Sequence, residues 1–186
     1  MTPTGLPDAD LDPGGPLSAR FIAQGAWRYR DAARLVWGLP YGRPARSGLD
    51  AVLRDGRGTR STKHALLAAL ADEAGLDVGL RLGLYLMDGQ NTPGVGPVLR
   101  AHGLAAVPEA HCVLAVGDDR VDLARPGVRP PVPEFVEEEA IRPDQVGAYE
   151  RDWHRRRLGA WAEAHDLDPA VVWAAREAAV ARLARV

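Results

Sequence analysis

The sequence predicts a protein of the α+β class, in which helices pack against an antiparallel sheet. A leucine- and alanine-rich stretch at 61–74 has helical spacing and ends at Gly75. Residues 78–87 alternate between leucine and other types, which is the pattern of a strand with one face on the core. Two further strands, at 110–116 and 120–124, are separated by a tight turn and predict a β-hairpin.

The composition is that of an ordinary globular chain, with 46% hydrophobic residues, 26% charged residues and a net charge of −2. That balance predicts neither a nucleic acid nor a membrane surface as partner. We expect a cytoplasmic protein, because no signal-peptide pattern is visible and the longest apolar run, 65–71, is too short to cross a bilayer. Cys112 is the single cysteine, which excludes an internal disulfide. No compact metal-ligand motif is present, so we expect no metal and no other cofactor.

The N-terminal part predicts an arm followed by short helices. Residues 1–16 are rich in proline, glycine and aspartate, so we expect a flexible N-terminal arm ahead of a single domain at 17–186. The segment 18–38 suits one helix, or two short helices broken near Gly25. A short helix follows at 47–53, with a serine in position to cap it.

The hairpin turn decides which side chains can meet. A two-residue turn at 117–118 begins with glycine, which suits a type II′ turn, and it pairs Val116 with Asp119. His111 and Asp122 then lie diagonally on one face, with Cα atoms roughly 7–8 Å apart. A His–carboxylate hydrogen bond can span that separation. A turn one residue later would carry Asp122 out of reach.

The C-terminal half predicts helices and a surface crossing. A short helix is expected near 95–102. The segment 125–142 is rich in proline and glutamate and predicts an irregular crossing of the surface. Two helices close the chain, one at about 143–164 and one capped by Asp168 with Pro169 at its first position.

A helix start, a strand histidine and a next-strand aspartate occur in the order of a cysteine hydrolase's nucleophile, base and orienting group. His111 and Asp122 supply the last two, but Arg60 stands where the thiol belongs. A guanidinium has no nucleophilic atom and cannot replace a thiolate. The neighbouring Ser61 is expected to cap the helix rather than to attack a substrate. Strand alternation points Cys112 away from His111 and into the core, where a thiol is unreactive.

The chain resembles the transglutaminase-like branch of the papain-like cysteine proteases, and in particular a bacterial group with four conserved sequence blocks. Those blocks read G-T-C-S-x-K-H-A-L-L, N-T-P, P-E-A-H-C and D-L-T. They match this chain at 58–67, 91–93, 108–112 and 122–124. Arg60 replaces the cysteine of the first block, and Ala124 replaces the threonine of the last. The resemblance covers roughly 38–185.

The resemblance implies a papain-like (transglutaminase-like) fold, with the nucleophile-position helix packed on an antiparallel sheet and helices at the C-terminus. It also implies acyl transfer or amide hydrolysis, for which this chain keeps the dyad of His111 and Asp122 without the cysteine. We therefore expect a non-catalytic protein that binds a peptide or small acidic ligand in the former active-site cleft. The candidate ligand-binding residues are Arg60, Lys63, His64 and Glu109.

Alternatives exist for the whole protein and for single residues. The chain is alternatively an active amidase, protease-type hydrolase or acyltransferase that uses another nucleophile or a metal, or a structural interaction protein. For His64 the alternative is a packed histidine without a role at the site. For Glu109 it is an exposed carboxylate at a strand edge.

Overall fold

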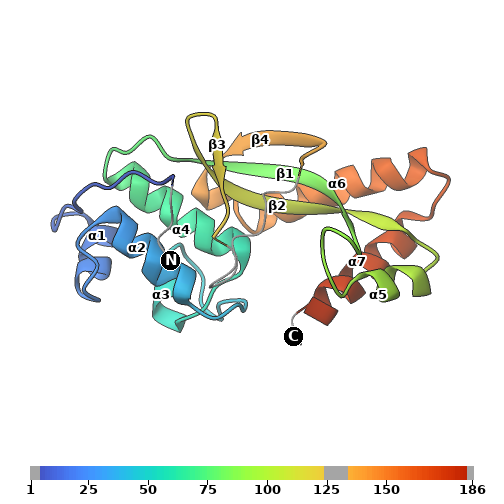
Figure 1. Ribbon diagram of the computed structural model, residues 1–186, viewed down its shortest axis with the longest axis horizontal. Coiled ribbons are helices and arrows are strands. Elements are labelled where there is room, and N and C mark those ends of the chain that lie inside the picture. The colour runs from blue at the N-terminus through green and yellow to red at the C-terminus, as the bar shows by residue number, and fades with distance from the viewer. Residues whose placement is uncertain (1–4, 124–133, 184–186) are drawn as a thin grey trace. The chain divides into compact units, whose positions relative to one another are not determined.

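The computed structural model describes residues 5–123 and 134–183. It confirms an α+β fold, with seven helices, one 3₁₀ turn and four strands in these ranges (Figure 1). The strands form one antiparallel sheet in the order β3-β2-β1-β4. By contact density the chain divides into two compact units. The first unit holds 1–81, 112–132 and 139–146, and the second holds 82–111, 133–138 and 147–186.

The first unit contains four helices, and three of them pack around the fourth, which is buried. They are α1 (Pro16–Ile22), α2 (Tyr29–Gly38), α3 (Ala51–Asp55) and α4 (Arg60–Glu73). The other three all contact α4, which buries leucine and alanine side chains along most of its length. Gly25 separates α1 from α2 with a φ of +84°, so the two-helix alternative for 18–38 is confirmed.

The first helix is capped from a distance by the end of α4. The carboxylate of Glu73 accepts the backbone N–H groups of Leu17 (2.9 Å) and Ser18 (2.7 Å). Burial raises the pKa of Glu73, but the hydrogen bonds from Ser18 and Leu17 outweigh it and the net pKa is lowered. A Cβ atom on Gly15 would stand 2.3 Å from a Glu73 oxygen, so only glycine leaves room for this cap.

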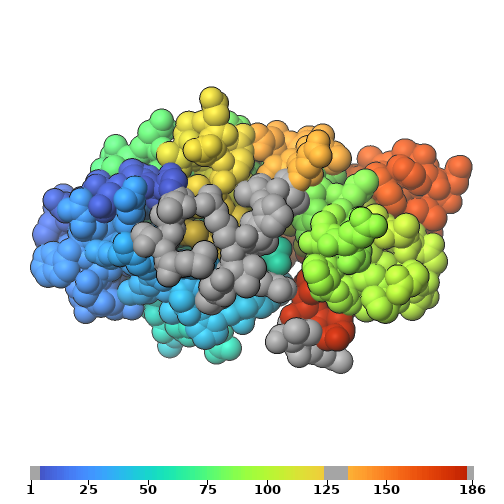
Figure 2. Space-filling model, in the orientation of Figure 1, coloured from blue at the N-terminus to red at the C-terminus, as the bar shows by residue number. Residues whose placement is uncertain are grey.

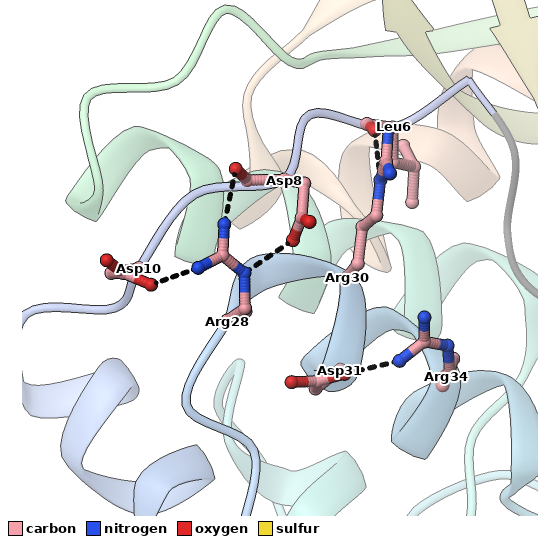
Figure 3. Close-up of polar contacts among 7 residues, drawn as sticks. All are labelled: Leu6, Asp8, Asp10, Arg28, Arg30, Asp31 and Arg34. Atoms are coloured by element: carbon pink, nitrogen blue, oxygen red, sulfur yellow. Dashed lines mark hydrogen bonds and ion pairs between the residues drawn. The ribbon is translucent and has the colours of Figure 1, made fainter.

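The N-terminal segment packs against the first unit, contrary to the predicted flexible arm. Leu6 and Leu11 are only 1% and 4% exposed, and Figure 2 shows the dark-blue start of the chain in contact with neighbouring parts of the first unit. Arg28 donates to the carboxylates of Asp8 (2.8 Å) and Asp10 (2.7 Å), as Figure 3 shows. The prediction fails over 5–15 because two isolated leucines and a paired arginine hold a segment that has no periodic pattern of its own.

The hairpin has the register that the glycine-first turn predicts. Strands β2 (Ala106–Val116) and β3 (Asp119–Val121) pair antiparallel, with Val116 opposite Asp119. Gly117 has a φ of +56°, as the first central position of a type II′ turn requires. The same register carried one residue past β3 brings Asp122 opposite Val113.

Strand β1 (Gly79–Asp88) is buried on both faces rather than on one. The alternation is correct, but Leu86 is 38% exposed while Tyr85 and Met87 are buried. The strand begins in the first unit and continues in the second, and each unit has its own core. The core of the second unit takes Tyr85 and Met87 from the face that the sequence assigns to solvent.

The second unit is completed by helices from the C-terminal part of the chain. They are α5 (Gly96–Ala101), α6 (Ala148–Ala164) and α7 (Pro169–Leu183), which agree with the predicted helices. The 3₁₀ turn η1 (Pro143–Gln145) precedes α6. No helix in the described ranges combines the length and the apolar character that crossing a membrane requires.

A fourth strand, β4 (Glu137–Ile141), lies within the predicted irregular crossing. Its three consecutive glutamates are poor strand formers, so propensity hides it, but an edge strand tolerates charge on its open side. The rest of that prediction, over 125–133, falls outside the described residues.

Candidate functional site

The predicted nucleophile helix begins at the expected place with a different cap. Arg60 is the first residue of α4, and Thr59 is the N-cap. The Thr59 hydroxyl accepts the backbone N–H of Thr62 at 3.3 Å. The capping role predicted for Ser61 is therefore wrong, because the helix starts early enough to place Ser61 inside its first turn.

Lys63 lies in the core and joins α4 to α2. Its side chain is fully buried, and Nζ donates to the carbonyl oxygen of Leu39 at the C-cap of α2. A cation at that end satisfies a carbonyl that the helix leaves without a partner. Burial lowers the pKa of Lys63. A Cβ atom on Gly58 would stand 2.8 Å from the Lys63 stem, which accounts for the glycine.

His64 is fully buried and ties α4 to the segment that follows β3. Its Nε2 accepts the backbone N–H of Leu123 at 2.8 Å and lies 3.5 Å from Oδ1 of Asp122. An accepting Nε2 carries no proton, so the imidazole is neutral. The structure therefore brings two predicted site residues together, His64 and Asp122, both nearly without solvent exposure.

Arg60 is the exception in this motif. It lies one helical turn before His64, on the same side of α4, and it is partly exposed. Over the described residues its guanidinium makes no hydrogen bond and no ion pair, whereas Thr59, Lys63 and His64 each have a structural partner. The N–H donors of Arg60 therefore take no part in the hydrogen bonds and ion pairs of the described fold.

His111 is buried in the second unit beside two aromatic rings. It is 3% exposed, with its ring centroid 6.2 Å from that of Tyr85 and 6.3 Å from that of Phe135. Phe135 in turn covers Gly83, where a Cβ atom would stand 2.4 Å from the ring. Cys112 is fully buried. The catalytic pairing of His111 with Asp122 stays a prediction.

Glu109 also lies in the second unit, in an ion pair that the sequence does not reveal. Its carboxylate accepts two hydrogen bonds from Arg176, at 2.6 Å and 2.8 Å. Nε2 of His154 donates to the carbonyl of Pro108 and lies 4.0 Å from Glu109. The Glu109 side chain is only 13% exposed, so the alternative of an exposed strand-edge carboxylate is wrong. Burial lowers the pKa of His154, and the nearby Glu109 opposes this.

The sequence does not predict the partners of several structurally important polar residues. Arg28, Glu73 and Arg176 each join segments more than fifteen residues apart. A lone charged residue on a helix looks the same whether it faces water or a distant partner. In the described ranges no group of three or more His, Cys, Asp or Glu residues is placed to hold a metal ion.

No family model matches the chain, and neither a curated protein nor a solved structure matches it.

Proposed function

We propose that this chain is a non-catalytic binding protein with a papain-like, transglutaminase-like fold, which binds a peptide or small acidic ligand at the start of α4. The observation that carries the proposal is that the partly exposed guanidinium of Arg60 makes no hydrogen bond and no ion pair with the described residues. The other two basic side chains of the 58–67 motif serve the fold, since the Lys63 ammonium and the neutral His64 imidazole both have hydrogen-bond partners in the core.

The position of Arg60 suits a carboxylate. Backbone N–H groups at a helix N-terminus favour a negative charge, and a guanidinium binds a carboxylate through two parallel hydrogen bonds. Without a ligand the same geometry is unfavourable, because a cation at this end costs about 0.3–1 kcal/mol. A bound anion removes that cost, so ligand binding is expected to stabilise the protein.

Catalysis has less support than binding. Arg60 supplies no nucleophile, and the Thr59 hydroxyl is engaged with Thr62. Cys112 is fully buried, away from any substrate that arrives from solvent.

We include a cytoplasmic location in the proposal, which cell fractionation with an antibody against the chain tests directly.

Isothermal titration with glutarate and with an acetylated Glu-Glu dipeptide tests the proposal. We expect binding that the Arg60→Gln variant weakens at least about tenfold, or roughly 1.4 kcal/mol. Added salt should weaken it as well, because the contact is partly exposed. The matched control is Arg57→Gln, which removes an exposed arginine three residues earlier and should bind normally.

Two results would count against the proposal. Equal affinity in Arg60→Gln and the unchanged protein would move the site elsewhere. Equal binding of glutaramide, the neutral analogue of glutarate, would show that charge is not recognised. Thermal melts of both variants verify folding, and Arg60→Gln should melt at the same temperature or slightly higher.

A further inference from the structure

A second candidate site is a hollow of about 300 Å³ in the first unit, at the end of the sheet where β1 begins and β2 and β4 end. Its volume lies at the lower end of the range for ligand pockets, roughly 300–1,000 Å³. Ile141 gives it an apolar side chain, and small residues such as Ala115 and Ala140 leave the space open. A hollow of this size takes a small molecule rather than a protein segment.

Two opposite charges line the same hollow. Asp77 lies two residues before β1, and Arg81 is the third residue of that strand. Among the residues described, neither side chain forms a hydrogen bond or an ion pair, with the other or with a third group. A carboxylate and a guanidinium that share a small space without touching leave a gap between complementary charges.

From this arrangement we propose that the hollow binds a free α-amino acid with an aliphatic side chain. Arg81 takes the α-carboxylate through its planar fork of N–H donors, and Asp77 takes the α-ammonium group. The aliphatic side chain lies against Ile141, whose apolar surface it removes from water. A zwitterion satisfies both charges at once and adds no net charge to the site.

The proposal is independent of the Arg60 site. The two sites use different residues and different ligand chemistry, since Arg60 is assigned a ligand with net negative charge. Failure of one leaves the other standing, and the Arg60→Gln variant distinguishes them because it should bind an aliphatic amino acid normally.

The test is a ligand series followed by NMR titration of the ¹⁵N-labelled protein. L-Leucine carries both charges, 4-methylpentanoate lacks the ammonium group, and 3-methylbutylamine lacks the carboxylate. We expect leucine to bind at least tenfold more tightly than either analogue, with the largest shifts at residues 77–81, 115–117 and 140–141.

Variants of the two charged residues complete the design. Arg81→Gln and Asp77→Asn should each weaken leucine binding about tenfold or more. The matched controls, Arg43→Gln and Asp72→Asn, remove exposed charges of the same unit outside the hollow and should leave it unchanged. Circular dichroism and thermal melts establish that all four variants fold.

The proposal is overturned by any of four results. The first is that leucine gives no saturable shifts up to about 10 mM. The second is that the two analogues bind as tightly as leucine, and the third is that leucine affinity is unchanged in both Arg81→Gln and Asp77→Asn. Weakening in Arg81→Gln alone also overturns it, because it assigns a site for carboxylates rather than for zwitterions.

Discussion

The Nε2 atom of His64 accepts the backbone N–H of Leu123 at 2.8 Å, and this bond joins the central helix to the chain leaving the hairpin. Both partners are buried. The bond requires a neutral imidazole, and it places Asp122 beside the ring. His64 thus holds one member of the predicted catalytic dyad in position.

Removing the imidazole should therefore destabilise the first unit. We expect His64→Ala to lower the free energy of unfolding by about 2–4 kcal/mol, from a cavity and a buried N–H group without an acceptor. Urea denaturation measures this. His102→Ala, at an exposed histidine, is the control and should change stability by less than about 0.5 kcal/mol. A loss below about 1 kcal/mol for His64→Ala would show that the bond is unimportant.

The buried Lys63 should make stability depend on alkaline pH. Its pKa in the folded protein is lowered from the usual 10.5, so between the two values the unfolded chain binds more protons. Stability should rise with pH through that window relative to Lys63→Met, which has nothing to titrate there. Unfolding measured in urea at pH 8 and pH 10 gives the comparison. Parallel pH profiles for both proteins would refute the assignment.

The ion pairs of Arg28 should protect the N-terminal segment from proteolysis. Arg28→Gln loses the fork that holds Asp8 and Asp10, so residues 5–15 should be cleaved several times faster. Limited digestion with the glutamyl/aspartyl protease V8, read by mass spectrometry, measures this. Arg34→Gln removes a neighbouring exposed arginine as control. Faster cleavage in the control as well would deny Arg28 a particular role.

Mild acid should weaken the second unit through His154. Burial lowers the pKa of this residue from 6.5, so below that value the unfolded chain takes up a proton that the folded chain resists. Stability should then fall as pH drops from 7.5 to 5.5, by at most about 1.4 kcal/mol per pH unit from this group. His154→Gln keeps a donor for the Pro108 carbonyl and should lose this dependence. An unchanged pH dependence of stability in His154→Gln would show that another group causes it.

Restoring a thiol at residue 60 tests the resemblance to cysteine hydrolases. In Arg60→Cys the helix N-terminus lowers the thiol pKa, and a retained base would lower it further. We expect alkylation by iodoacetamide to be at least about tenfold faster than in Arg57→Cys, an exposed control. The added variant His111→Ala should remove most of the gain. Equal rates at positions 57 and 60 would leave the catalytic resemblance without support.

The sequence predicts the turns and helices of this fold that are determined by residues close together in the chain. The glycine-first turn set the pairing of Val116 with Asp119, and the leucine-rich stretch set α4 to within one residue at each end. The helix cap was misplaced because Thr59 and Ser61 are both good caps, and a two-residue shift costs little in propensity.

Long-range features escaped prediction for a physical reason. Near the end of β1, Met87 is buried and Leu86 is exposed because the core of the second unit covers the Met87 face, and the alternation in the sequence is the same whichever face is covered. The pairing of Glu109 with Arg176 joins residues 67 apart, and nothing local marks it. At the candidate site, the sequence shows the residue types. It does not show that Lys63 and His64 have buried structural partners while Arg60 has none among the described residues.

The buried state of Lys63 has a practical consequence, because it is the chain's single lysine. Dyes, cross-linkers and affinity resins that couple to lysine amines find no such group on the folded surface. Twenty-two arginines carry the remaining basic charge, so reagents selective for guanidinium groups offer a better chemical handle. Coupling at Lys63 would instead report the moment at which the contact between α4 and the end of α2 comes apart.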